Sequence, residues 1–183
     1  MSSQTEYDQV YAKRLAAIER DHQLTILSSM NQPQSDASKK ATQYIVYTDY
    51  KPDSPAKSFT ISVYTPFENV DKYGHSKAEF QSQLLFDTDR WQDKMHITVL
   101  ETLGSESRLA FFDFQNMGLA QLALKAFMNL ARKAEVGKID GNISSFDKEN
   151  YAKLKHIFEK YEFDFQMTDP KLGIGKISKS FKA

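Results

Sequence analysis

The chain changes its hydrophobic period near Gln115, and this change constrains its fold more than any other feature. Between residues 42 and 112, apolar and aromatic residues alternate with polar ones in short runs, which is the two-residue period of half-buried β-strands. After Gln115 the apolar residues fall on one face of a helix: Leu119, Leu122, Ala123, Ala126, Phe127, Leu130 and Ala131. A chain with both patterns is expected to form a central sheet flanked by helices.

Strands and helices alternate only in the second half of the chain. We expect strands over residues 42–50, 59–63, 80–86, 95–103, 108–112, 138–144, 163–167 and 173–177. The helix after Gln115 ends before Gly137, and Asp147 is the expected N-cap of a further helix. Strand–helix–strand crossovers join parallel strands, so the helix after Gln115 is expected to bridge a parallel pair formed by 108–112 and 138–144. The predicted fold class is α+β, with a mixed, mostly antiparallel central sheet.

The N-terminal region is expected to be a helix followed by a linker. Tyr7, Val10, Tyr11, Leu15 and Ile18 recur at helical spacing and form one apolar stripe. The stripe packs either on the main body, which we favour, or on a second copy of the chain as a homodimer. Residues Ser28 to Lys40 are polar and read as a linker. We therefore expect an N-terminal helix and linker over 1–40 and a single domain over 41–183.

Composition excludes several classes of protein. The 183 residues include no cysteine, which excludes disulfides. The 24 basic and 24 acidic side chains balance, so the chain has no net positive charge to attract nucleic acid. No apolar run approaches the ~20 residues that cross a bilayer, and the polar N-terminus does not resemble a signal peptide. The four histidines lack metal-ligand spacing. We expect a soluble, cytoplasmic protein with no metal, no nucleic acid and no membrane partner.

The segment from Gln115 to Ala120 lies between an expected strand and the first turn of a helix. A helix N-terminus offers unpaired backbone N–H groups and the positive end of the helix dipole, which suit a pyrophosphate. Gly118 would let the backbone approach that group without an intervening side chain. The segment is therefore a candidate phosphate site, although an ordinary strand-to-helix turn has the same pattern.

Gln115-x-x-Gly118-x-Ala120 resembles the pyrophosphate-loop signature of the GCN5-related N-acetyltransferases (GNAT). Downstream, Asn150, Leu154 and the run from Phe158 to Phe163 resemble a second segment of that family. The resemblance implies a GNAT-like domain with acetyl-CoA as co-substrate, in which the parallel strands splay apart and the pantetheine arm pairs with the strand before the loop. The coenzyme-binding positions that it implies are Asp113, Phe114, Gln115, Asn116, Met117, Gly118, Leu119, Ala120, Ser144 and Asn150.

The catalytic residues of the family are only partly matched. Phe158 stands where many members have a tyrosine that protonates the leaving thiolate, so that role is either vacant or filled by a neighbour, with Tyr161 as our candidate and Tyr151 as the other possibility. The alternative for Phe158 is simple core packing. Glu162 replaces a glycine of the family segment. For the general base we choose Glu101 over His96; the two lie five residues apart on one expected strand and therefore face opposite sides.

Three functions remain open at this point. The leading interpretation is an acetyl-CoA-dependent N-acetyltransferase, in which a small amine or a protein amine attacks the thioester directly. The second is a catalytically lapsed GNAT-fold module that binds acyl-CoA or a protein partner. The third is an interaction protein without coenzyme, whose N-terminal helix and 42–65 hairpin form the partner surface.

Overall fold

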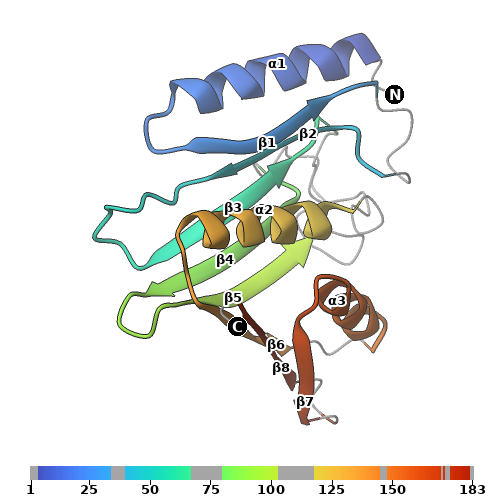
Figure 1. Ribbon diagram of the computed structural model, residues 1–183. Helices are drawn as coiled ribbons and strands as arrows, with labels where there is room; N and C mark the ends of the chain where they lie inside the picture. The colour runs from blue at the N-terminus through green and yellow to red at the C-terminus, as the bar shows by residue number, and fades with distance from the viewer. Residues whose placement is uncertain are drawn as a thin grey trace. The chain divides into compact units, whose positions relative to one another are not determined.

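A computed structural model of the chain describes residues 4–33, 40–66, 80–102, 118–144, 148–169, 171 and 174–181. Its helices and strands, drawn in Figure 1, are α1 (Gln4–Arg20), β1 (Thr25–Asn31), β2 (Gln43–Thr48), β3 (Ser58–Tyr64), β4 (Ser82–Asp89), β5 (Lys94–Thr102), α2 (Leu119–Lys133), β6 (Lys138–Ser144), α3 (Lys148–Lys160), β7 (Asp164–Asp169) and β8 (Ile174–Ser180). The expected strand 108–112 and the hairpin turn before it lie outside the described residues.

The strands form one sheet in the order β1-β2-β3-β4-β5-β6-β8-β7. Pairs β1–β2, β2–β3, β6–β8 and β7–β8 are antiparallel, and β5–β6 is parallel. The predicted fold class, a mostly antiparallel mixed sheet with one parallel pair and flanking helices, is confirmed. The described parallel partner of β6 is β5, whereas residues 108–112, which we expected in that place, lie outside the described residues. The hydrophobic pattern identifies strands but does not say which of them become neighbours.

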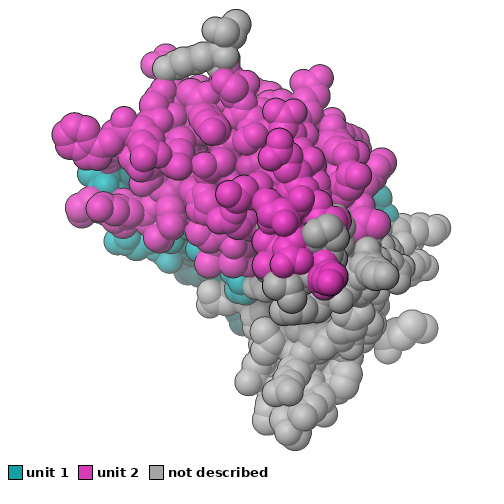
Figure 2. Space-filling view, turned by 90° about the horizontal axis from the view of Figure 1, so that it is seen from below, with its two compact units in different colours: residues 1–54, 59–84, 100–127 teal, residues 55–58, 85–99, 128–183 magenta. Residues whose placement is uncertain are grey.

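The described residues divide into two compact units (Figure 2). Unit 1 comprises residues 1–54, 59–84 and 100–127, and unit 2 comprises residues 55–58, 85–99 and 128–183. The division passes through strands and through α2, and the expected boundary at residue 40 remains a prediction. Among the described residues, no helix is both long enough and apolar enough to cross a membrane.

In unit 1, helix α1 packs on the N-terminal strands through its apolar stripe. Tyr11 and Ile18 of α1 join Ile45, Tyr47 and Tyr64 of β2 and β3 in one buried cluster. The Tyr11 hydroxyl also donates to the Tyr44 carbonyl oxygen at 3.3 Å. The preferred interpretation of the stripe, packing on the main body, is confirmed.

The linker expected over residues 28–40 is wrong at its start. Ser28 to Asn31 belong to β1, where Asn31 pairs with Gln43 of β2. Most side chains of β1 are exposed, as in an edge strand held by backbone hydrogen bonds. Such a strand needs few apolar residues, and its sequence therefore reads as a linker.

In unit 2, helices α2 and α3 end in the same C-terminal motif. Glu135 and Glu162 adopt left-handed φ angles of 57° and 65° just beyond the helix ends. After α3, the Phe163 N–H donates to the Phe158 carbonyl and the Glu162 N–H to the Glu159 carbonyl, both at 3.0 Å. This is a Schellman motif, whose left-handed position is most often occupied by glycine.

The helix ends of unit 2 cover one face of its strands. Lys179 of β8 donates to the Tyr161 carbonyl at 2.8 Å, and the Arg132 guanidinium lies over the Phe181 ring. Ile139 and Ile177, on the same face, are buried. Because side chains alternate along a strand, the polar residues between them lie on the opposite face.

Candidate functional site

The polar face of unit 2 holds a cavity of about 450 Å³. The lining residues come from strands β5, β6, β8 and β7: Lys94, His96, Lys138, Asp140, Gly141, Asn142, Asp164, Gln166, Lys176, Ile177 and Ser178. Most of them alternate along their strands on the polar face, and Gly141 and Ile177 contribute from the positions between. Nine of these eleven residues have polar or charged side chains. The cavity therefore suits a polar ligand.

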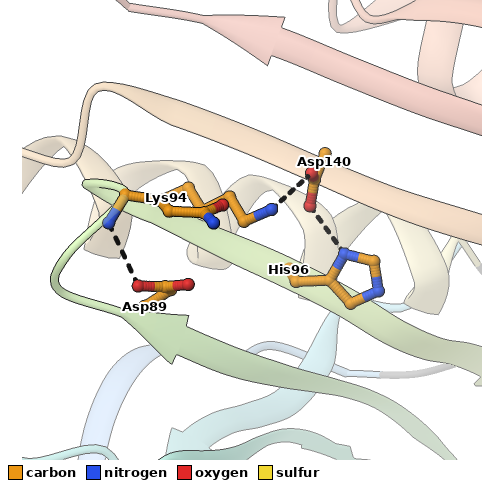
Figure 3. Close-up of polar contacts among 5 residues, drawn as sticks. Asp89, Lys94, His96 and Asp140 are labelled. Carbon is orange, nitrogen blue, oxygen red and sulfur yellow. Dashed lines mark hydrogen bonds and ion pairs between the residues drawn. The ribbon is translucent and has the colours of Figure 1, made fainter.

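At the centre of this face His96 and Asp140 form a close pair across the parallel strands (Figure 3). The His96 Nδ1 and Asp140 Oδ1 atoms lie 2.6 Å apart, and Lys94 Nζ lies 3.2 Å from the other carboxylate oxygen. The pair follows from the register, since His96 is the direct partner of Asp140 in the β5–β6 ladder. The side chains remain partly accessible, at 30% for His96 and 23% for Asp140.

The charge of Asp140 determines the hydrogen-bonding state of the imidazole. Burial acts to raise the pKa of Asp140, but hydrogen bonds from His96 and Lys94 and their charges outweigh it and hold the pKa below its ordinary value. The carboxylate is therefore ionised at neutral pH and can only accept. Nδ1 of a neutral His96 carries the proton, which leaves the Nε2 lone pair available as a base.

The parallel ladder ends next to this pair. Its register runs from Lys94 opposite Lys138 to Ile97 opposite Gly141, whereas β5 continues to Thr102 and β6 to Ser144. The burial of the side chains on the apolar face of β5 falls at the same point, since Ile97 is fully buried and Val99 is 37% exposed. Beyond Ile97 the edge of β5 that faced β6 has no partner in the described ladder.

Gly141 sits at the last ladder position for a steric reason. A Cβ atom built on it would lie 2.9 Å from the Ile97 carbonyl oxygen and 3.1 Å from Ile177 Cγ1. A residue with a side chain would push β6 away from β5 and β8 at this point.

In unit 1, Gly118 begins helix α2. Its carbonyl accepts from the Leu122 N–H at 3.2 Å, and its φ of 73° is left-handed, which favours glycine. Leu119 is fully buried, so only its backbone could meet a ligand, and Ala120 is half-buried. The other residues of the expected pyrophosphate loop, Asp113, Phe114, Gln115, Asn116 and Met117, lie outside the described residues.

Among the remaining expected site residues, Tyr161 has a described side chain. The side chains of Glu101, Ser144 and Asn150 lie outside the described part of the structure, although their backbones belong to β5, β6 and α3. Tyr161 follows α3 on the helix-covered face of unit 2 and does not line the cavity. Burial raises the pKa of its hydroxyl.

Phe158 is a core residue. Its side chain is fully buried, and its ring packs edge-on against Phe163 at 5.3 Å between centroids. The core-packing interpretation of Phe158 is therefore confirmed.

Sequence reasoning missed Asp140 and Lys94 and set His96 aside. A signal was available in the sequence. Lys94 and His96 occupy alternate positions on one expected strand, and Lys138, Asp140 and Asn142 occupy alternate positions on the expected strand that follows the α2 helix. Only the register of β5 against β6 brings these two rows together. Among the described residues, no three His, Asp or Glu side chains converge as metal ligands.

Comparisons with known proteins found similarity only among solved structures. No family model and no curated protein matches the chain. The similar structures include PaiA N-acetyltransferase from Thermoplasma acidophilum in complex with coenzyme A, at 7% identity over 68% of this chain and 62% of that chain, with a TM-score of 0.46. They also include the GNAT domain of PAT from S. lividans (11%, covering 68% and 61%, TM-score 0.46) and mutant forms of the spermidine/spermine N-acetyltransferase SpeG from Vibrio cholerae (10%, covering 69% and 68%, TM-score 0.45).

Several of the similar structures are thus GNAT N-acetyltransferases. The match spans less than two thirds of the first of them. At TM-scores below 0.5 the similarity describes the chain path and carries no conclusion about activity.

Proposed function

We propose that the chain is an acetyl-CoA-dependent N-acetyltransferase acting on an amine. The observation that carries this proposal is the early end of the β5–β6 ladder. The two strands are parallel and joined by the α2 crossover, yet their pairing stops at Ile97 and Gly141 while both strands continue. An extended ligand with amide groups, such as a pantetheine arm, can pair with β5 beyond Ile97, where no described strand pairs with the edge that faced β6.

The beginning of α2 supports the same ligand. Gly118 has the left-handed backbone conformation that the resembled loop requires, and the first-turn N–H groups that follow it suit a pyrophosphate. Bound there, acetyl-CoA would supply the activated acyl group as a thioester. The amine nitrogen forms the new bond to the acyl carbon, and the bonding pair of the C–S bond leaves on sulfur.

A module that binds acyl-CoA without turning it over is the second candidate. Phe158 favours it, because this buried ring stands where the resembled family often has a proton-donating tyrosine. Tyr161 remains the proposed donor. Glu101 is the base predicted from sequence, and His96, which is predicted to face the other side of β5, is the alternative base. Release of free thiol from acetyl-CoA in the presence of amines separates an enzyme from a binding module.

Acetyl-CoA binding measured by calorimetry tests the coenzyme site. Gly118→Asp places a carboxylate and a side chain at the start of α2, so binding should weaken at least tenfold. Gly118→Asn adds a side chain without charge and tolerates the left-handed backbone, and should weaken binding less. The matched control Asn129→Asp makes the same charge change at an exposed position of α2 and should bind as the wild type does.

The thermal unfolding of each variant is compared with that of the wild type, so that loss of fold is not mistaken for loss of binding. Wild-type protein that is folded but does not bind acetyl-CoA would overturn the proposal. Equal weakening by Gly118→Asp and Asn129→Asp would also overturn it, because the effect would then be one of overall charge.

A further inference from the structure

We propose that the unit 2 cavity binds the acceptor, that this acceptor is an amine that also carries a carboxylate, and that His96 accepts a proton from its ammonium group. The ligand's role as acceptor rests on the proposed function. The binding of this ligand to the cavity does not rest on the proposed function, and it can be measured without coenzyme. Two neighbouring rows of side chains across the sheet of unit 2 lead to this inference.

The first row contains the acid–base group. His96, Asp140, Ser178 and Asp164 are successive register partners across β5, β6, β8 and β7. Asp140 binds Nδ1 of His96, and in the described part of the chain no side chain engages Nε2. Nε2 can therefore accept a hydrogen bond or a proton from a ligand, whereas the Asp140 carboxylate is already engaged by His96 and Lys94.

The second row contains one cation and two amides and no carboxylate. Asn142, Lys176 and Gln166 are register partners across β6, β8 and β7, and all three line the cavity. Within the described residues none of the three side chains makes a hydrogen bond or an ion pair. An ammonium group flanked by two amides can bind a carboxylate through several N–H donors at once.

The spacing of the two rows sets the kind of ligand. Successive residues on one face of a strand are about 6.6 Å apart and neighbouring strands about 4.8 Å apart. His96 and Lys176 differ by one row and two strands, so their Cα atoms lie about 12 Å apart, and a molecule held between the ends of these two side chains needs its nitrogen and its carboxylate several bonds apart. 4-Aminobutyrate has this form and is the probe that we choose. Its ammonium group would lie at His96 and its carboxylate at Lys176.

The proton balance of the transfer is complete with these groups. His96 takes one proton from the ammonium group, and the lone pair that this frees forms the N–C bond as the C–S bond breaks. The nitrogen loses a second proton when the amide forms. One of the two protons neutralises the departing thiolate, and the other is released to water.

Two-dimensional ¹H–¹⁵N spectra of the histidine rings test the site on the full chain, with His96→Asn used to assign the His96 signals. We expect 4-aminobutyrate to shift the His96 Nε2 signal and to bind about tenfold more tightly than butylamine or butyrate, which each lack one charge. Lys176→Met should weaken 4-aminobutyrate about tenfold and leave butylamine unchanged. Lys171→Met, at an exposed lysine outside the cavity, is the matched control and should change neither.

An unmoved His96 signal at saturating 4-aminobutyrate would overturn the inference, and so would equal binding of butylamine and 4-aminobutyrate. A titration of the same samples with acetyl-CoA separates this result from the proposed function. Binding of the probe without binding of acetyl-CoA supports the cavity and overturns the acetyltransferase. Binding of acetyl-CoA without binding of the probe supports the enzyme and overturns this acceptor site.

Discussion

His96 and Asp140 lie on neighbouring parallel strands with 2.6 Å between Nδ1 and Oδ1, and Lys94 binds the other oxygen of the same carboxylate. The negative carboxylate of Asp140 therefore lies between His96 and Lys94. Without it, the positive charge of Lys94 and any positive charge on His96 would lie side by side. The arrangement fixes the ring of His96 and directs Nε2 away from Asp140 (Figure 3).

Asp140→Asn should lower the free energy of unfolding by about 1–3 kcal/mol at pH 7, because charged hydrogen bonds to His96 and Lys94 are lost. The pKa of Asp140 is lower in the folded than in the unfolded chain, so its stabilisation is present above about pH 4 and disappears as the pH falls through the folded value. Urea unfolding at several pH values between 7 and 3 should show the difference from wild type shrinking. Asp164→Asn, at an exposed carboxylate of the same face, is the control; a pH-independent difference for Asp140→Asn would contradict this account.

Gly141→Ala should destabilise the chain by about 1–3 kcal/mol, because the added Cβ meets the Ile97 carbonyl oxygen at 2.9 Å. The backbone atom cannot turn aside as a flexible side chain would. Denaturant unfolding measures the loss, with Asn142→Ala on the neighbouring exposed position as the control. Equal midpoints for the two variants would show that β5 and β6 are not held together here.

Glu162→Gly should raise the free energy of unfolding by about 0.5–1 kcal/mol, because glycine adopts the left-handed conformation at this helix end without strain. The Lys179–Glu162 ion pair that is lost is exposed on the glutamate side and contributes little. Glu162→Ala removes the same charge but keeps the strain, and should give no gain. Glu135→Gly, at the equivalent position after α2, should stabilise in the same way; a gain from alanine equal to that from glycine would refute the explanation.

Ile18→Ala should cost about 2–4 kcal/mol, since its side chain is buried in the cluster that holds α1 on the sheet. Val10→Ala, in the same helix and 44% exposed, should cost less than about 0.5 kcal/mol. Thermal and urea unfolding followed by circular dichroism measure both. Similar small effects would mean that α1 is not docked in solution and would restore its apolar stripe as a candidate partner surface.

Local elements were largely predictable from sequence. The strand expected over 138–144 is β6, and the helix expected after Gln115 is α2, which ends before Gly137. Both predictions rest on the period at which apolar residues recur within one segment, which a few neighbouring residues are enough to reveal. β1 was missed because an exposed edge strand has no such period.

The candidate site was predictable only in part. The sequence predicted Gly118 as the point where the backbone could approach a phosphate, and the structure adds a left-handed φ of 73° as a separate reason for glycine there. The odd spacing of His96 and Glu101 predicts that they face opposite sides of one strand, and the side chain of Glu101 lies outside the described residues. Which of the two faces holds the cavity did not follow, because that depends on where α2 and α3 pack.

By itself, then, the sequence determined the conformations that neighbouring residues impose on one another: strand alternation, helix faces and the glycine that begins α2. The tertiary structure decided which strands pair and in which register. Strands pair through backbone N–H and C=O groups that every residue except proline has, so the strand alone does not encode its partner. The meeting of His96 with Asp140, 44 residues apart, is set by the packing of the whole sheet.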